Sequence, residues 1–271
     1  MRWVRYVNAG DAGQAESGGA AHYGMLRDDV IVQVDRPPFA GTAQATGHEV
    51  PLARARLLAP VQPVNFFAAG QPNHVEHVRK YCVKRGLPFA LPDRCDFNYR
   101  GPNAVIGPDE AVILPADCTG TVQVEAELAI VMGRTAKRVA AKDALGYVFG
   151  YTLCNDISER NWQFNDRTVW RGKNTDTFNP IGPWIDTAPD LDSLVTRIRV
   201  NGIECGSFRT NDMVFGVAEL IEILTRNITL QPGDVILTGA DEPCPDVRAG
   251  DVVEIEIDGL GLLRNPITAE A

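Results

Sequence analysis

Short apolar segments separated by turn residues dominate the first part of the chain. Each segment is five or six residues long, and the loops between them are rich in glycine and alanine. Short apolar runs bounded by turn residues are typical of β-strands. The prolines at 60 and 63 interrupt this pattern and favour a boundary there. The pattern predicts a small β-rich N-terminal domain over residues 1–60 and a larger domain over residues 61–271. The expected strands of the first domain are residues 3–7, 21–26 and 30–34.

The remainder of the chain alternates between apolar strand patterns and a few helical ones. In residues 212–225 apolar side chains recur at helical spacing, with Asn211 or Asp212 as the expected N-cap. A second helix is expected over residues 73–84, capped by Asn73. The balance is that of a β-rich α+β protein. The expected strands are residues 64–69, 104–114, 122–132, 146–153, 234–238 and 251–257, and a short helix is expected around residues 142–145.

Charge and composition exclude several classes of partner. The formal net charge is −9, and the sequence contains no cluster of basic residues. Both observations argue against nucleic acid or an anionic membrane as a partner. The chain has no apolar run long enough to span a bilayer and no apolar signal core at its start. A cytoplasmic location is therefore the expectation. The six cysteines form no zinc-binding spacing and are expected to be free thiols.

Two glutamates stand two residues apart in an apolar segment. On a β-strand, residues i and i+2 face the same side, so Glu125 and Glu127 would present both carboxylates together. The spacing alone favours glutamates that face solvent. The apolar run at residues 128–132 and the later Asp156 favour a metal site, because acids beside a core need a cation to offset their desolvation. Three carboxylates without cysteine or histidine suit Mg²⁺ or Mn²⁺.

Other catalytic signatures are absent from the sequence. It contains no phosphate-binding GxxxxGK[ST] loop, no GxSxG nucleophile elbow and no HExxH zinc motif. His74 and His77 fall on the predicted helix at i and i+3 and share a face. For His74, a solvent-facing position on an amphipathic helix is at least as good an interpretation as a functional role.

Six segments carry motifs in one consistent order: residues 125–129, 150–163, 172–184, 200–202, 230–239 and 250–252. Together they resemble the fumarylacetoacetate hydrolase family over about residues 60–271. This resemblance implies a mixed β-sandwich roll, a homodimer and one divalent ion, Mg²⁺ or Mn²⁺, per active site. It also implies that Glu125, Glu127 and Asp156 are the metal ligands.

The resemblance also implies a substrate site. Arg160, Gln163 and Lys173 would line it, with Lys173 and Gln163 supplying charge and hydrogen bonds where an enolate develops. Arg160 either holds a substrate carboxylate or pairs with a carboxylate of the protein. Tyr99 and Arg100 lie in a region that often contributes to the substrate pocket of this family. Asp96 lies where some members carry a fourth acidic ligand.

Two departures from the family pattern bear on the reaction. Hydrolytic members often carry a His-x-x-Glu segment whose two side chains activate water. Here His77 occupies the histidine position, but Lys80 stands where the glutamate is expected. Members commonly have Thr-Gly-Thr-Pro, whereas this chain has Ala240 in place of the second threonine. Both changes favour a reaction that needs no hydrolytic water.

Three functions remain after these observations. The first is metal-dependent hydrolysis of a C–C bond in a small diketo acid, of the acylpyruvate or fumarylpyruvate type, in catabolism of aromatic compounds or sugar acids. The second is decarboxylation or oxo–enol isomerisation of a β-oxo or 2-hydroxymuconate-type acid. The third is a binding dimer without catalysis, which the buried acids and Lys173 argue against. Hydrolysis, with His77 as base, is narrowly preferred.

Overall fold

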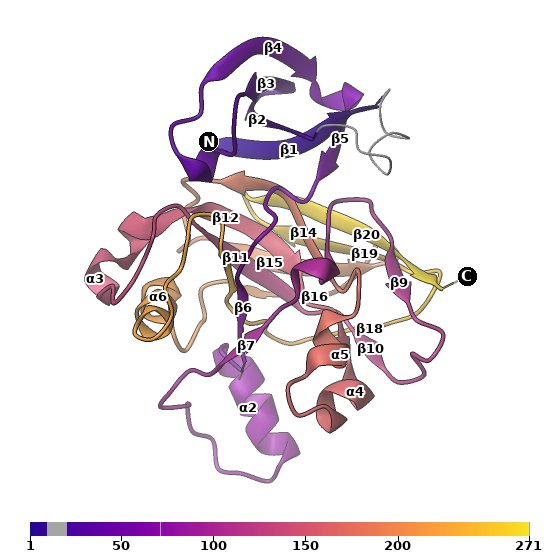
Figure 1. Ribbon diagram of the computed structural model, residues 1–271. Helices are drawn as coiled ribbons and strands as arrows, with labels where there is room; N and C mark the ends of the chain where they lie inside the picture. Colours follow the sequence, from indigo (N-terminus) through magenta and orange to yellow (C-terminus); the bar gives the residue numbers. More distant parts are fainter. Residues whose placement is uncertain (10–20, 71, 271) are drawn as a thin grey trace.

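Three β-sheets form the framework of the part of the protein that the computed structural model describes (Figure 1). The structure describes residues 1–9, 21–70 and 72–270. Over these ranges strands outnumber α-helices, so the expected β-rich α+β class is confirmed. Figure 1 places the first strands at one end of the molecule and helices α2, α4 and α5 at the opposite end.

The largest sheet has twelve strands. Ten follow the order β4-β3-β2-β1-β14-β12-β11-β17-β6-β7, while β5 pairs with β1 and β8 with β14. The strands are β1 Arg2–Asn8, β2 His22–Arg27, β3 Val30–Val34, β4 Ala45–Pro51, β5 Ala55–Leu58, β6 Phe66–Ala69, β7 Phe97–Tyr99, β8 Val105–Ile106, β11 Ala126–Met132, β12 Val148–Asn155, β14 Asn179–Asp186 and β17 Val235–Leu237.

A five-stranded and a three-stranded sheet complete the β-structure. The five-stranded sheet has the order β16-β15-β19-β20-β9 and the three-stranded sheet the order β13-β10-β18. Their bounds are β9 Val112–Leu114, β10 Val122–Gln123, β13 Ser158–Glu159, β15 Val195–Val200, β16 Ile203–Arg209, β18 Asp246–Val247, β19 Val252–Ile257 and β20 Gly261–Ala269.

The helices are short and lie around the sheets. None that the described ranges contain is both long and apolar enough to cross a membrane. The α-helices are α2 Val75–Lys84, α3 Ala141–Ala144, α4 Arg160–Asn165, α5 Trp170–Asn174 and α6 Val217–Thr225, and the 3₁₀ turns are η2 Pro38–Ala40, η3 Leu52–Arg54, η4 Pro102–Ala104 and η5 Leu145–Tyr147.

Strand β11 lies at the centre of the molecule, and its alternating side chains enter two different cores. Leu128, Ile130 and Met132 join the main core, which includes side chains of the five-stranded sheet and of α6. Ala129 and Val131 join a second core on the other face, together with side chains of β6 and β17. Because successive strand residues point to opposite faces, this burial on both sides explains the uninterrupted apolar run.

The first five strands have a small core of their own around Val4, Tyr6, Leu26 and Ile31. Strand β1 connects this part to the remainder of the protein, because Arg2 and Trp3 pair with Asp186 and Ile185 of β14. The three expected N-terminal strands are present as β1, β2 and β3.

Two helix predictions need correction at their N-termini. Helix α2 is capped by His74 rather than Asn73. Helix α6 begins at Val217, five residues later than expected, and Gly216 is its N-cap, whose N–H donates to Glu219 at 2.8 Å. The preceding residues are held outside the helix, because Met213 pairs with His74 in an isolated β-bridge and Phe215 N–H donates to Asn73 Oδ1 at 2.9 Å.

Several strand predictions were also inexact. The segments 104–114 and 122–132 each contain two separate strands, with turns or irregular backbone between them. Strands β14, β15, β16 and β20 were not expected, although they cover about thirty residues of the two larger sheets.

His74 is a buried structural residue. Its Nε2 lies 3.2 Å from the carbonyl oxygen of Thr210, and its ring packs edge-on against Phe208 at 5.5 Å. Because a carbonyl only accepts, Nε2 carries the proton and Nδ1 is the unprotonated nitrogen. The described residues offer Nδ1 no hydrogen-bond partner. Burial lowers the pKa of His74 below its ordinary value.

We predict that His74 makes the protein less stable in mild acid. The unfolded chain binds a proton at His74 more readily than the folded protein, so the free energy of unfolding falls as pH drops below about 6.5. One such group contributes a slope of at most about 1.4 kcal/mol per pH unit. In His74→Gln, whose amide can still donate to Thr210, denaturant unfolding between pH 7 and 5 should show a smaller decrease. An equal decrease in both proteins would show that His74 titrates normally.

Candidate active site

The ends of two neighbouring strands bring the three predicted carboxylates together. Strands β11 and β12 pair antiparallel, with Ala126 opposite Asn155 and Glu127 opposite Cys154. The adjacent residues Glu125 and Asp156 continue this pairing, since Asp156 N–H donates to the carbonyl of Glu125 at 2.9 Å. Glu125 and Glu127 therefore project on the same side, as their i, i+2 spacing predicts.

These carboxylates form a compact buried cluster. One oxygen from each of Glu125, Glu127 and Asp156 can be chosen so that all three lie within 4.8 Å of one another. The residues are only 8%, 3% and 1% exposed. Three carboxylates packed so closely away from water require positive charge nearby.

Three basic side chains supply part of that charge. Lys173 Nζ donates to Glu125 Oε2 at 2.5 Å and to Asp156 Oδ2 at 2.7 Å. Arg100 forms a two-pronged ion pair with Asp156 at 2.7 and 2.8 Å. Arg160 donates to Glu125 Oε1 at 2.7 Å. Of the two roles expected for Arg160, the structure shows pairing with a carboxylate of the protein.

The pairing is uneven, because no Lys or Arg in the described part of the chain forms an ion pair with Glu127. Its Oε2 accepts a hydrogen bond from Gly239 N–H at 2.5 Å. Burial, together with the charges of Asp156 and Glu125, raises the pKa of Glu127 well above its ordinary value. Burial acts in the same direction on Glu125, but Lys173 and Arg160 hold its pKa below the ordinary value.

This arrangement fits a divalent cation. All three donors are oxygens, which hard ions such as Mg²⁺ and Mn²⁺ prefer. An ion beside Glu127 would supply the positive charge that this carboxylate lacks. Glu125, Glu127 and Asp156 are the residues that would hold it.

Two short helices place Arg160, Gln163 and Lys173 next to the carboxylates. Helix α4 is capped by Glu159, whose carboxylate accepts from Trp162 N–H. Helix α5 lies against it at Gly172, where an added Cβ would be only 2.7 Å from the backbone nitrogen of Gln163. The missing side chain allows this close approach, and it directs Lys173 toward the cluster.

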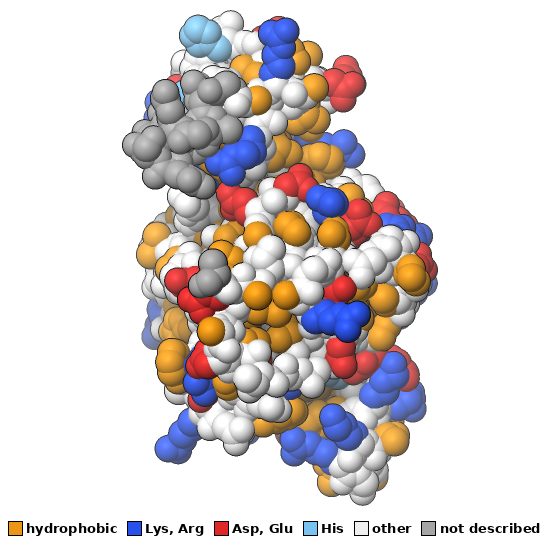
Figure 2. Space-filling view, turned by 90° about the vertical axis from the view of Figure 1, so that its right-hand side faces the viewer, with side chains coloured by type: hydrophobic (Ala, Val, Ile, Leu, Met, Phe, Trp, Pro, Cys, Tyr) orange, Lys and Arg blue, Asp and Glu red, His pale blue; other side chains and the backbone are white. Residues whose placement is uncertain are grey.

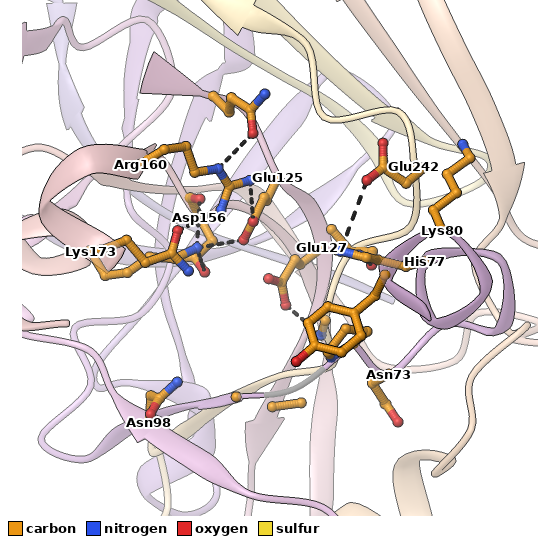
Figure 3. A pocket seen from close by; sticks show the side chains of 18 of the residues that line it. Asn73, His77, Lys80, Asn98, Glu125, Glu127, Asp156, Arg160, Lys173 and Glu242 are labelled. Atoms are coloured by element: carbon orange, nitrogen blue, oxygen red, sulfur yellow. Dashed lines mark hydrogen bonds and ion pairs between the residues drawn. The ribbon is translucent and has the colours of Figure 1, made fainter. Parts of the chain in front are cut away.

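Helix α2 forms the opposite wall, and His77 points from it toward Glu127 (Figure 3). Buried Asn73 fixes the start of this wall, because its amide donates to the carbonyls of Thr238 at 2.8 Å and Phe215 at 3.0 Å. His77 Nδ1 lies 3.0 Å from the carbonyl oxygen of Ala240. Its Nε2 lies 4.0 Å from Glu242 Oε1.

A cavity of about 750 Å³ separates the two walls. It is lined by the carboxylate cluster and by the predicted residues His77, Arg160, Gln163, Lys173 and Arg100. Lys80 and Ala240, the two departures from the family pattern, line it as well. Gln123 and Glu242 also line it, although they were not singled out from the sequence and no motif there marks them. Asn73 lines it too, and the sequence marked it only as a helix cap.

Two residues considered from the sequence lie elsewhere. The side chain of Tyr99 is 63% exposed and packs against Phe67 at 4.7 Å between ring centroids. The described lining of the cavity does not include it, because the strand alternation of β7 turns Asn98 inward instead. Asp96 is exposed and is not a member of the carboxylate cluster.

Comparisons with known proteins agree in one family. A family model for the C-terminal domain of fumarylacetoacetate hydrolase matches residues 66–268, and an Rv2993c-like N-terminal model matches residues 1–60. The mitochondrial oxaloacetate tautomerase fahd2 of Xenopus laevis is 35% identical over 233 residues, covering 81% of this chain and 70% of its own length.

Several solved structures match the whole chain, and two of them are enzymes with different reactions. The 5-carboxymethyl-2-hydroxymuconate delta-isomerase of Mycobacterium smegmatis has a TM-score of 0.87 and 35% identity, with 100% of both chains covered. The maleylpyruvate hydrolase of Sphingobium sp. SYK-6, solved with manganese(II) and pyruvate, has a TM-score of 0.77 and 27% identity, again with 100% of both chains covered.

We predict that Glu127→Gln weakens binding of Mn²⁺ and Mg²⁺ by roughly tenfold or more, because the substitution removes the charge that lacks a partner. Titration calorimetry measures the affinity. Glu222→Gln, which changes a partly exposed carboxylate of α6 that pairs with Arg226, is the matched control and should bind like the unmodified protein. Unchanged affinity in Glu127→Gln would contradict the ligand assignment.

Proposed function

This chain belongs to the fumarylacetoacetate hydrolase family, and we propose that it is a divalent-metal-dependent enzyme that moves a proton on a small oxo acid. The observation that carries the proposal is the position of His77, which faces the buried carboxylate cluster across a cavity large enough for such a substrate (Figure 3). Mg²⁺ or Mn²⁺ is the proposed cofactor.

The charge of the cavity favours an anionic substrate. Six basic and five acidic side chains line it, so a divalent ion would make the site clearly positive. Figure 2 shows Lys and Arg side chains at the lower end of the molecule, where Figure 1 places α2. The basic residues are Lys80, Lys84, Arg85, Arg100, Arg160 and Lys173, and the acidic ones are Glu125, Glu127, Asp156, Glu242 and Asp246.

The proposed ion would act as a Lewis acid on the oxo group of a 2-oxo acid bound through its carboxylate and oxo oxygens. The protein contributes hydrogen-bond donors at the same place. Gln163 uses its oxygen to accept from Arg160 at 2.6 Å, so its NH₂ group is the part that can donate to substrate. Lys173 is held at the cluster by two carboxylates and adds positive charge where an enolate oxygen develops.

His77 is the proposed base. The carbonyl of Ala240 can only accept, so Nδ1 carries the ring proton and Nε2 has the free electron pair. Nε2 would take a proton from the carbon next to the oxo group, while the electron pair moves to the oxo oxygen. Return of the proton to a different atom completes an oxo–enol isomerisation.

Isomerisation is the first candidate because it needs only these residues and no positioned water. The isomerase and tautomerase named above also match this chain at higher identity than the maleylpyruvate hydrolase does. This reverses the narrow preference for hydrolysis drawn from the sequence. Hydrolysis of a C–C bond is the second candidate, supported by the pyruvate and manganese in the structure of that hydrolase.

Two further elements belong to this proposal. The first is a division of the chain near residue 60, which the separate N-terminal core and the two family models support. The second is a homodimeric state, which the family resemblance supports.

The substrate assay distinguishes the candidates directly. With Mg²⁺ or Mn²⁺, we predict that the protein accelerates interconversion of the enol and oxo forms of oxaloacetate, which ultraviolet absorbance and NMR measure. Cleavage of an acylpyruvate or of fumarylpyruvate into two acids would favour the hydrolase, and release of carbon dioxide from oxaloacetate the decarboxylase. No acceleration of any of these substrates would contradict the proposal and favour a binding role.

We also predict that Lys173→Met lowers kcat by about a hundredfold, the usual loss on removing a donor to a developing oxyanion. Calorimetry should show metal affinity kept or increased, since Glu125 and Asp156 lose a competing cation. Lys142→Met, in helix α3 and outside the cavity lining, is the matched control. Retained kcat in Lys173→Met would contradict its role at the enolate.

A further inference from the structure

A carboxylate lies beside His77 even though Lys80 occupies the position where the family pattern has glutamate. Glu242, in the loop that follows β17, places Oε1 4.0 Å from Nε2 of His77 (Figure 3). Among the described residues no other carboxylate oxygen lies within 4.0 Å of a nitrogen of this ring. The neighbouring Glu76 pairs instead with Arg79 at 3.2 Å on the exposed side of α2.

The same loop contacts both nitrogens of the ring. The carbonyl of Ala240 lies against Nδ1 and the carboxylate of Glu242 against Nε2. The loop begins at Gly239, which has a φ of +89° and whose N–H donates to Glu127. One short segment therefore determines both the tautomer of His77 and its position relative to the carboxylate cluster.

We infer that Glu242 is the positioning residue for His77 and replaces the carboxylate that is missing at residue 80. The inference rests on the proposed function, in which His77 takes up a proton. When Nε2 accepts that proton, the imidazole becomes a cation, and the carboxylate at 4.0 Å stabilises it. The proton returns from Nε2 to the product, so the cycle requires no further reactant.

The other charged groups around the ring do not take the place of such a carboxylate. Glu127, toward which His77 points, accepts from Gly239 N–H and is a proposed metal ligand. Lys80 on the same helix lines the same cavity and opposes a second positive charge on His77. Glu125 acts on His77 from across the cavity, but it is already paired with Lys173 and Arg160. His74 is neutral at the start of the helix. Glu242 is thus the charge that offsets Lys80, and the half-buried position of the pair limits screening by solvent.

Moving the carboxylate from residue 242 to residue 80 provides a kinetic test. Glu242→Gln should lower kcat at least about tenfold with little change in KM, because it removes help to proton transfer rather than to binding. Adding Lys80→Glu in the double variant should recover most of that loss, because it restores a carboxylate one helical turn from His77. Unchanged kcat in Glu242→Gln, or no recovery in the double variant, would overturn the inference.

NMR of the histidine side chains tests the pair without any turnover. The chain has four histidines, so ¹⁵N-labelled imidazole signals are few, and His77→Gln identifies the signal of His77. In metal-free protein, we expect the Nδ1–H form, and the pH midpoint of ring protonation should move lower in Glu242→Gln. The matched control is Glu76→Gln, which removes the adjacent but outward-facing carboxylate and should leave the midpoint unchanged.

The two readouts separate the inference from the proposed function. A lower midpoint in Glu242→Gln, in a protein that turns over none of the substrates, would support the His77–Glu242 pair and contradict the enzyme proposal. An equal midpoint in Glu242→Gln and the unmodified protein would overturn the pair, whatever the activity.

Discussion

The burial of three carboxylates at one point is the constraint on which the rest of the site depends. Glu125, Glu127 and Asp156 would repel one another in a low-dielectric interior without compensating charge. Lys173, Arg100 and Arg160 balance two of them and leave Glu127 as the carboxylate that most needs a cation. A divalent ion would complete this balance, and such an ion would in turn favour an anionic, oxygen-rich ligand.

The fold meets this constraint with elements of different kinds. Paired strand ends hold the carboxylates with little freedom, because β11 is buried on both faces. The short helices α4 and α5 supply the donors from one side. Helix α2 supplies His77 from the other side, and the buried residues Asn73 and His74 attach its start to the body of the protein. The loop from Gly239 to Glu242 contacts Glu127 at one end and His77 at the other, so one segment links the carboxylate cluster to α2.

Local sequence patterns were sufficient where a side chain's position depends only on residues next to it in the sequence. The i, i+2 spacing of Glu125 and Glu127 and the apolar run after them were enough to expect a buried strand with two carboxylates on one side. The predicted start of α6 was wrong, because Asn73 and His74 contact residues 213–215 and hold them outside the helix. Asn73 and His74 are distant in sequence, so no local pattern shows these contacts. Glu242 was missed for the same reason, since only the folded chain brings it to His77. Tyr99 was expected near the substrate pocket, but the alternation of side chains along β7 places Asn98 in the cavity lining instead.

The most direct test of this account is to locate a metal ion in crystals. Crystals of the protein soaked with Mn²⁺ and oxalate, an unreactive dicarboxylate, would be measured at a wavelength where manganese scatters anomalously. The account predicts one strong anomalous peak within about 2.0–2.3 Å of oxygens from Glu125, Glu127 and Asp156, with oxalate completing the coordination and facing His77. A peak at any other group of residues, or none at saturating Mn²⁺, would contradict the claim that these buried carboxylates are a metal site.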